Sequence, residues 1–337
     1  MLKKINKIPE AKECFEAALK LDNQSYLAKY NLSLLLLHQK DYELGWREYE
    51  SRFYVEKTPA FTKDIPKLEK FDNRDKIFIW GEQGIGDQVF FASMLRFVDP
   101  CLDITVGLDK RLVSIFERSF QNLKFSSLSD KKLDTGFTKQ ISIGSLGNFV
   151  GNKNLEKFKA LDFLKPDQGR KKFFKKEICN NGKFICGISW RSLNKKTGRW
   201  RSLTLDQLVP FFKKNNFHYI DLQYDDTVNE LQHFEDKYGI KIQSISNLDK
   251  YNDIDGMFSL IDCCDLVLTI DNSIAHFAGS IGKSTLMMLP FGVGSIWYWH
   301  DDIISTWYPS IKIFRQAENS DWDHLVKKIT NEFEFNF

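Results

Sequence analysis

Residues Lys76-Ile-Phe-Ile-Trp-Gly-Glu-Gln-Gly-Ile-Gly-Asp87 decide the fold class of this chain. The apolar run at 76–80 predicts a short buried strand, and the amphipathic stretch at 88–98 predicts a helix. Three glycines stand between the two, where the absence of a Cβ lets the backbone turn sharply or approach a ligand. A strand, a glycine-rich loop and a helix in this order are typical of parallel α/β sheets.

The end of this loop carries a candidate catalytic carboxylate, Asp87. The loop does not fit the dinucleotide-binding fingerprint, because that pattern needs glycine at the position of Val89. Asp87 would repel a bound pyrophosphate, but it is well placed to take a proton from a substrate hydroxyl. The alternative interpretation is that Asp87 only caps the helix at 88–98.

Alternating strands and helices continue on both sides of a boundary region at 151–182. Before it we expect a strand at 103–107, a helix at 109–119 and a third apolar run at 138–146. After it we expect strands at 183–190, 217–223, 240–245, 265–270 and 284–289, and helices at 204–214, 226–237, 253–263, 272–280 and 320–334. Two such series predict two doubly wound α/β domains that face each other. The basic run at 170–176 is interpreted as solvated surface.

The first 55 residues predict helices only, at 8–22, 25–39 and 41–53. Three positions recur 34 residues later, so that Ala11, Phe15 and Ala18 correspond to Gly45, Tyr49 and Arg52. This spacing is the tetratricopeptide period, although Arg52 replaces a small residue and Asn23 replaces the expected proline. About one and a half repeats cannot bury their own faces, so these helices should pack on the rest of the chain.

These patterns divide the chain into four segments. Residues 1–55 are expected to form tetratricopeptide-like helices and 56–75 a linker. Residues 76–165 are expected to form an N-terminal Rossmann-like domain, and residues 180–337 a C-terminal one. The last helix is expected either within its own domain or packed back on the N-terminal domain.

The composition excludes several classes of protein. The chain has 337 residues, with 48 Lys and Arg against 45 Asp and Glu, so it lacks the basic excess of a nucleic-acid binder. The hydrophobic fraction of 42% is enough for packed cores. The longest aliphatic run, 34–37, is far shorter than a membrane span, and no secretion signal follows Met1. The six scattered cysteines favour reduced thiols and a cytoplasmic location.

Two strand-end segments of the second series carry residues suited to binding an anion. The segment 189–202 has no acid and five cations, Arg191, Lys195, Lys196, Arg199 and Arg201. At the end of a parallel strand it predicts a phosphate clamp, and the alternative is a mobile basic surface loop. The segment 265–279 places at a helix start Asp271, Asn272, Ser273 and His276. Free N–H groups and a hydroxyl there can cradle phosphate oxygens.

Two other patterns do not carry their usual chemistry. Gly282-Lys-Ser284 resembles the end of a P-loop, but that motif needs glycine at Phe277 and a helix after the lysine, where a strand is expected. Asp253 and Asp255 imitate a metal-binding acidic pair, but they stand at a helix start. No metal site is expected.

Taken in order, these segments resemble bacterial glycosyltransferases of family 9, the heptosyltransferase type, and more closely the branch fused behind tetratricopeptide repeats. The matching residues are Gly45-Trp46-x-x-Tyr49-Glu50-x-Arg52, Glu82-Gln-Gly-x-Gly-Asp87, Arg201-Ser-Leu203, Asp221-Leu-Gln223, Asp265-Leu-Val267, Asp271-x-Ser273-x-Ala-His276-x-Ala-Gly279, Trp307-Tyr-Pro309, Phe314-Arg-Gln316 and Asp321-Trp322. The resemblance covers nearly the whole chain and rests on the ordered set, because each motif alone is weak.

The resemblance implies a GT-B fold, in which the N-terminal domain takes the acceptor and the C-terminal domain takes a nucleoside-diphosphate sugar. It implies inverting transfer without a metal or other cofactor. Asp87 would be the general base, on an acceptor-side loop with Gln83, Gly84 and Gly86. Arg201, helped by Arg199 or Lys196, would neutralise the leaving diphosphate. The other donor-side residues would be Trp190, Gln223, Asp271, Asn272, Ser273 and His276.

The family has a lysine near the position of Arg201, which leaves the identity of the clamp cation open. The transferred sugar would be a hexose or a heptose, and the acceptor a cell-surface glycan, a lipid-linked glycan or a protein. The repeats would offer a surface for a protein partner, in the cytoplasm or at the inner face of the membrane. Two alternatives stay open, an inert interaction module and another nucleotide-sugar enzyme such as an epimerase or a hydrolase.

Overall fold

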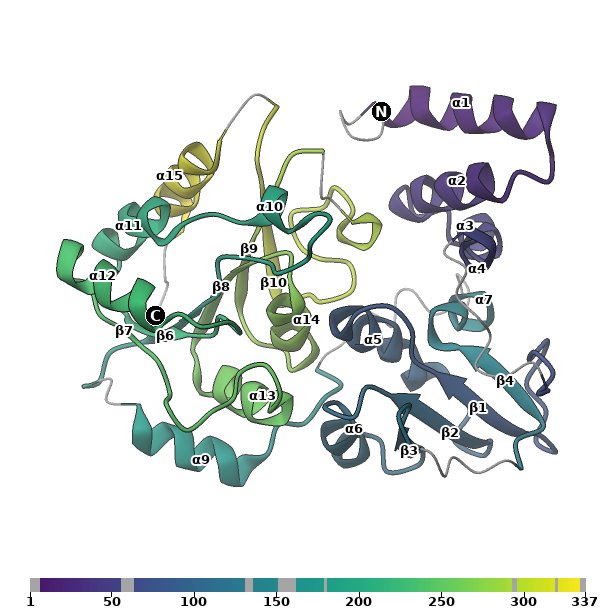
Figure 1. The fold of residues 1–337 in the computed structure, drawn as a ribbon, viewed down its shortest axis with the longest axis horizontal. Coiled ribbons are helices and arrows are strands. Elements are labelled where there is room, and N and C mark those ends of the chain that lie inside the picture. The colour runs from purple at the N-terminus through teal and green to yellow at the C-terminus, as the bar shows by residue number, and fades with distance from the viewer. Residues whose placement is uncertain are drawn as a thin grey trace. The chain divides into compact units, whose positions relative to one another are not determined.

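The computed structural model describes residues 7–55, 64–130, 136–150, 162–178, 181–292, 296–318 and 321–333. The chain divides into two compact units. The first holds Met1–Lys165 and Ile296–Asp301, and the second holds Pro166–Ser295 and Asp302–Phe337. Each unit is built around one parallel sheet, which confirms the expected α/β class with two sheets (Figure 1).

The sheet of the first unit has the order β3-β2-β1-β4, and all of its strand pairs are parallel. Its strands are β1 (Lys76–Trp80), β2 (Asp103–Leu108), β3 (Lys124–Ser127) and β4 (Lys139–Ser142). The helical elements between and after them are α5 (Ile85–Ala92), η2 (Ser93–Phe97), α6 (Val113–Ser119), η3 (Ile143–Ser145) and α7 (Gly147–Val150). The expected strand at 76–80 is confirmed. It was visible in the sequence because buried parallel strands are apolar on both faces.

Two helices of this unit differ from the expectation in where they begin. The helix expected at 88–98 begins at Ile85, and its regular part ends at Ala92. The helix expected at 109–119 begins at Val113, because Asp109 accepts hydrogen bonds from Arg111 N at 3.0 Å and from Leu112 N at 2.9 Å and forms a turn. The strand β3 was not expected, since its Lys-Phe-Ser-Ser sequence carries little hydrophobic pattern.

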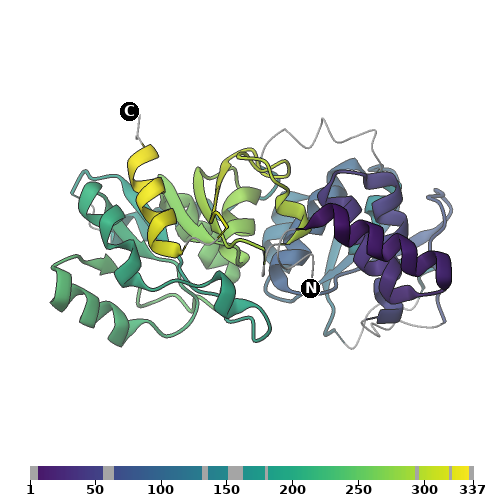
Figure 2. The ribbon, with the colours of Figure 1, turned by 90° about the horizontal axis from the view of Figure 1, so that it is seen from above.

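The N-terminal helices belong to the first unit. They are α1 (Ile8–Leu21), α2 (Tyr26–His38), α3 (Tyr42–Tyr49) and α4 (Arg52–Val55), and α1 packs on α2 and α2 on α3 (Figure 2). Trp46 of α3 lies so close to Gly147 of α7 that a Cβ at position 147 would collide with the indole. The expectation that these helices pack on the rest of the chain is confirmed, whereas their tetratricopeptide character stays a prediction.

The sheet of the second unit has the order β10-β9-β8-β5-β6-β7, again with parallel pairs. Its strands are β5 (Ile185–Ile188), β6 (His218–Asp221), β7 (Ile242–Gln243), β8 (Leu266–Ile270), β9 (Thr285–Leu289) and β10 (Ile311–Arg315). Its helices are α9 (Gln168–Glu177), α10 (Gly198–Arg201), α11 (Leu205–Lys214), α12 (Val228–Tyr238), α13 (Ile254–Cys263), α14 (Ser273–Ser280) and α15 (Trp322–Glu332). β8 and β9 are buried at every position.

Several expectations about this unit were wrong. The boundary region at 151–182 contains the helix α9, and the unit begins at Pro166 rather than at 180. By contrast, the basic run on α9 is solvated over most of its length, as expected, although Phe174 is buried and Arg170 and Lys171 form ion pairs with α13 and its N-cap. β10 was not expected.

The last helix lies within its own unit, which decides between the two expectations for it. α15 packs on α11, and Leu325, Val326 and Ile329 join the core of the second unit. The short segment Ile296–Asp301, with η5 (Trp297–Trp299), belongs instead to the first unit. None of the helices in the described part of the chain is long and apolar enough to span a membrane.

Candidate functional site

The carboxyl end of β8 is built around Asn272, which caps the helix α14. Its Oδ1 accepts a hydrogen bond from Ile274 N at 3.0 Å, and its Nδ2 donates to Ser189 Oγ at 2.8 Å. Ser189 follows β5, so the cap joins the ends of two neighbouring strands. Asn272 is thereby occupied with structure, while Ser273 beside it is half-buried at the helix start. The free N–H groups of such a helix start favour an anion.

Arg201, the last residue of α10, reaches this helix start. Its Nη1 lies 3.3 Å from Asp271 Oδ2 and 3.5 Å from the Asp271 carbonyl oxygen. The arginine side chain is 11% exposed and the aspartate side chain 2%. The buried Nε of Arg201 has no hydrogen-bond partner among the described residues. A buried N–H of a cation without an acceptor is costly, and charge-assisted hydrogen bonds to an anionic oxygen would offset that cost.

His276 lies on α14 next to this pair, but it is a neutral core residue. It is 2% exposed, and its Nδ1 is 3.1 Å from Tyr308 Oη. Burial, and after it the positive charge of Arg201, lowers the pKa of His276 to about 3. In this structure, therefore, the imidazole is a neutral core group with almost no surface exposed to a ligand.

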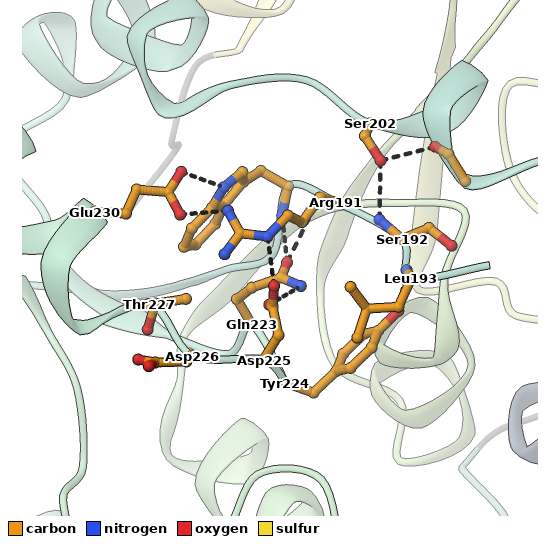
Figure 3. Close-up of polar contacts among 12 residues, drawn as sticks. Arg191, Ser192, Leu193, Ser202, Gln223, Tyr224, Asp225, Asp226, Thr227 and Glu230 are labelled. Atoms are coloured by element: carbon orange, nitrogen blue, oxygen red, sulfur yellow. Dashed lines mark hydrogen bonds and ion pairs between the residues drawn. The ribbon is translucent and has the colours of Figure 1, made fainter. Parts of the chain in front are cut away.

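Gln223 and Trp190, which the sequence suggested as donor-side residues, are both fully buried. Gln223 is 0% exposed, and its Oε1 accepts hydrogen bonds from Trp190 N at 3.2 Å and Arg191 N at 3.1 Å (Figure 3). Trp190 is 0% exposed, belongs to the core of the second unit and donates its indole N–H to Glu230 at 3.1 Å. Both residues fix the backbone that follows β5, and their contact with a nucleotide stays a prediction.

The other cations of the segment 189–202 separate into two groups. Arg191 is taken up by Asp225, at 2.7 Å from its Nε, and by Glu230, as Figure 3 shows. Lys196 and Arg199 are exposed, and Arg199 Cζ lies 3.6 Å above the Trp200 ring. Arg201 is therefore the cation that the structure brings to the start of α14.

In the first unit, Asp87 lies in the first turn of α5, three residues after the N-cap Gly84. Its Oδ2 accepts a hydrogen bond from Gly84 N at 3.1 Å, and its Oδ1 accepts one from Tyr298 Oη at 3.2 Å. Asp87 is thus not the N-cap, although it completes the cap. The carboxylate is half-buried, so each oxygen is oriented while part of the group faces solvent.

The other residues of this loop have separate roles. Gln83 is exposed, has a left-handed backbone with φ of 60°, and donates from its side chain to Tyr49 Oη at 2.9 Å. Gly86 lies in the first turn of α5. Glu82, one residue before Gln83, is buried and faces the guanidinium of Arg52.

Arg52 is fully buried and forms a two-pronged pair with Glu82, at 3.2 Å from Nε to Oε2 and 2.7 Å from Nη2 to Oε1. Burial disfavours the charged guanidinium, but the charge and hydrogen bonds of Glu82, together with the charges of Tyr49 and Glu50, outweigh this effect and raise the pKa of Arg52 above its ordinary value. Its remaining contacts, at 2.9 to 3.2 Å, are with Tyr49 O, Glu50 Oε1, Ser142 Oγ and Ser145 Oγ.

Three residues that contact the candidate site residues or their loop, Arg52, Tyr308 and Tyr298, were not among the candidates from the sequence. Arg52 was visible as the departure from the repeat, and Tyr308 stands in the motif at 307–309. Tyr298 had no signal, because it lies 211 positions from the carboxylate that it contacts.

Two further features of the structure concern metal binding and hollows. Among the described residues, no three His, Cys, Asp or Glu side chains gather closely enough to hold a metal ion. A hollow of about 400 Å³ is lined by Glu69, Lys70, Asp72, Arg74, Asp75 and Lys139. It lies at the amino ends of β1 and β4, and the candidate residues lie beyond the carboxyl ends of the strands.

The sequence is similar to that of Protein FlbA from Caulobacter vibrioides, with 25% identity over 312 residues. The alignment covers 85% of this chain and 51% of FlbA, so the chain spans about half the length of this curated relative. No protein-family model matches the chain.

Two solved structures are similar over most of the chain. The glycosyl transferase family 9 from Veillonella parvula aligns with 78% of this chain and 92% of its own length, with a TM-score of 0.52 and 11% identity. The ADP-heptose LPS heptosyltransferase II from E. coli aligns with 76% of this chain and 98% of its own length, with a TM-score of 0.52 and 10% identity. The chain therefore has the α/β fold, with two parallel sheets, of heptosyltransferase-type glycosyltransferases of family 9.

Proposed function

We propose that this chain is a glycosyltransferase that moves a sugar from a nucleoside-diphosphate donor to an acceptor hydroxyl, without a metal or other cofactor. The observation that carries the proposal is the Arg201 guanidinium, held at the start of α14 with a buried Nε that lacks an acceptor among the described residues. The fold shared with family 9 glycosyltransferases supports the same reading.

The second unit would bind the donor. As the bond between the anomeric carbon and the diphosphate breaks, negative charge develops on the leaving oxygen. Arg201 would neutralise that charge, and the N–H groups after Asp271 and the Ser273 hydroxyl would donate to the phosphate oxygens. Stabilisation of developing charge by oriented donors is often the largest contribution to catalysis.

The first unit would supply the base. Asp87 would take the proton of an acceptor hydroxyl while that oxygen attacks the anomeric carbon on the face opposite the diphosphate, which inverts the configuration. Hydrogen bonds from Gly84 and Tyr298 orient the carboxylate, and an ionised carboxylate accepts a proton on an oxygen lone pair. A positioned general base contributes roughly 10²- to 10⁴-fold to the rate.

For the donor and the acceptor we propose only a chemical class. One similar structure is named for ADP-heptose, so ADP-sugars are the first donor class to test. The acceptor would be a glycan, a lipid-linked glycan or a protein hydroxyl. A protein partner on the N-terminal helices and a cytoplasmic location, with or without attachment to the membrane, belong to the same proposal.

The donor site is tested by titrating ADP, UDP, GDP and CDP into the purified chain in a calorimeter. One diphosphate should bind, and Arg201→Gln should weaken it about 10- to 100-fold, because charge-assisted hydrogen bonds contribute about 1.5 to 3 kcal/mol. Lys213→Gln on α11 removes an exposed cation of the same unit and should change the dissociation constant less than 2-fold. Equal affinity of wild type and Arg201→Gln would reject the donor site.

The base is tested by following sugar transfer from the donor so identified. Asp87→Asn should lower the transfer rate by roughly 10²- to 10⁴-fold with unchanged diphosphate binding. Transfer at the wild-type rate would remove Asp87 from the mechanism. Tight binding without transfer over a broad acceptor panel would favour an inert interaction module, and an isomerised donor would favour an epimerase.

A further inference from the structure

We propose that the N-terminal helices hold the Asp87 loop in its productive geometry, and that Arg52 is the positioning residue that does so through Glu82. This inference rests on the proposed function, in which Asp87 is the base. It gives these helices a role inside the enzyme, where the sequence pattern suggested a surface for a protein partner.

The first step runs from α4 to the end of β1. Arg52 is the first residue of α4, and Glu82 is the second residue after β1. The carboxylate of Glu82 takes both prongs of the guanidinium and also accepts Gly144 N at 3.2 Å and the hydroxyl of Ser142. The packing leaves no room for a side chain at Gly144, because a Cβ there would collide with that carboxylate. Glu82 is therefore fixed from three elements, α4, β4 and η3.

The second step runs from Glu82 to Asp87. Gln83 has the left-handed backbone that non-glycine residues rarely adopt, and its side chain donates to Tyr49 of α3. Gly84 then donates its N–H to the Asp87 carboxylate. The helices α3 and α4 thus hold the two residues that immediately precede the glycine whose amide orients the base.

The second contact of Asp87 has the same support. Tyr298 belongs to η5, which packs on α2. The neighbouring Trp297 ring packs edge-on against Trp46 of α3 at 5.3 Å. His300, just after η5, donates from Nδ1 to the α2 carbonyl of His38 at 2.9 Å, and its Nε2 is 3.1 Å from Tyr42 Oη. The donors Gly84 and Tyr298 are therefore both anchored on the N-terminal helices.

The two-pronged contact with Glu82 requires an arginine at position 52. A guanidinium presents parallel N–H groups that match a carboxylate, whereas a lysine ammonium is a point charge without that geometry. Arg52→Lys keeps the charge opposite Glu82 but loses the two-pronged contact. The expected result is a fold that forms with a displaced loop, and a misplacement of about 1 Å at a catalytic group can cost roughly 10²-fold in rate.

The experiment is a double-mutant cycle with Asp87→Asn, with Arg47→Lys as the matched control. Arg47→Lys is the same substitution on α3, at a position where the arginine side chain is 69% exposed. Arg52→Lys should lower kcat about 10- to 100-fold while the dissociation constant of the nucleoside diphosphate changes less than 2-fold. In the Asp87→Asn background it should cost less than a further 2-fold, because its effect passes through Asp87. Arg47→Lys should leave kcat unchanged.

Three results would overturn the proposal. They are an unchanged kcat in Arg52→Lys, an equal loss in both backgrounds, and a parallel loss of diphosphate binding. The last two would make Arg52 a general stabiliser of the fold.

A second measurement does not depend on catalysis. Hydrogen exchange of the peptide 82–92 should be faster in Arg52→Lys than in wild type and in Arg47→Lys. If wild type transfers no sugar but this exchange difference appears, the proposed function fails and the positioning of the loop by Arg52 stands. If exchange is the same in all three proteins, the positioning role fails whatever the activity.

Discussion

Each of the two units contains an arginine beside a buried carboxylate, and the two arginines differ in burial and in how many of their N–H groups have an acceptor. Arg52 is 0% exposed, and its guanidinium contacts five acceptor groups, among them both oxygens of Glu82. Arg201 keeps 11% exposure, meets Asp271 at 3.3 Å, and its Nε has no hydrogen-bond partner in the described part of the chain.

The difference shows how an arginine–carboxylate pair can have either a structural role or a binding role. A saturated pair has no donor left for a ligand, so it stiffens the elements that it joins. An unsaturated pair retains a donor that only an added acceptor can satisfy, at the start of a helix that already favours anions. We therefore assign Arg52 to positioning and Arg201 to binding, and the predictions below test that division.

The largest expected effect on stability is at the saturated pair. Arg52→Met leaves the Glu82 carboxylate, 2% exposed, without its counter-charge. Breaking a buried ion pair in this way costs about 3 to 5 kcal/mol. Urea unfolding would measure it, and Arg47→Met, at an exposed position of α3, should change the free energy of unfolding by less than about 0.5 kcal/mol. Equal values for the two variants would show that the Arg52 pair stabilises nothing.

The next effect is at Gly144, whose missing Cβ leaves room for the same pair. Gly144→Ala would push a methyl group into the Glu82 carboxylate. Overpacking of this kind costs about 1 to 3 kcal/mol. The matched control is Gly169→Ala on α9, an exposed position where the nearest atom, Asp167 Oδ1, would lie 3.1 Å from the new Cβ. If Gly144→Ala is as stable as wild type by urea unfolding, the pair is less tightly enclosed than described.

The free energy of unfolding is expected to depend on pH through His276, which lies next to the Arg201–Asp271 pair. His276 has a pKa lowered to about 3, by burial first and by Arg201 second, so the folded protein keeps it neutral. The unfolded chain takes up a proton below pH 6.5, so the stabilisation is complete above that pH and is lost as the pH falls toward 3. The loss at pH 5 is about 2 kcal/mol.

Urea unfolding between pH 8 and pH 5 measures this loss for wild type and His276→Gln. The variant should lose about 2 kcal/mol less than wild type over that range, because glutamine does not titrate. Identical pH profiles would mean that the pKa of His276 is the same in the folded and the unfolded protein.

The smallest effect is expected at an exposed arginine of the same segment. Arg199 lies over the Trp200 ring at 3.6 Å, and a cation–π contact in solvent contributes about 0.5 kcal/mol. Arg199→Ala should lower the free energy of unfolding by about that amount in thermal unfolding. A loss as large as that of Arg52→Met would show that burial does not separate these arginines.

The sequence predicted well the elements that are apolar over their whole length. The strands expected at 76–80, 265–270 and 284–289 appear within one residue, because central parallel strands are buried on both faces. It missed β3 and the helix α9, whose few apolar residues carry little periodic signal. The helix expected at 88–98 began three residues early, because Gly84 is its N-cap and Gly86 lies in its first turn.

By itself, the sequence determined the fold class, the alternation of strands and helices, and the strand-end segments that carry Asp87, Arg201 and Asp271. Only the tertiary structure decided which of their neighbours are buried and which partners they have. It buried Trp190 and Gln223, joined Arg201 to Asp271 across 70 positions, and placed Tyr298 on Asp87 across 211. The physical reason is that hydrophobic periodicity is a local property of the chain, whereas the satisfaction of a buried charge depends on partners that only folding brings together.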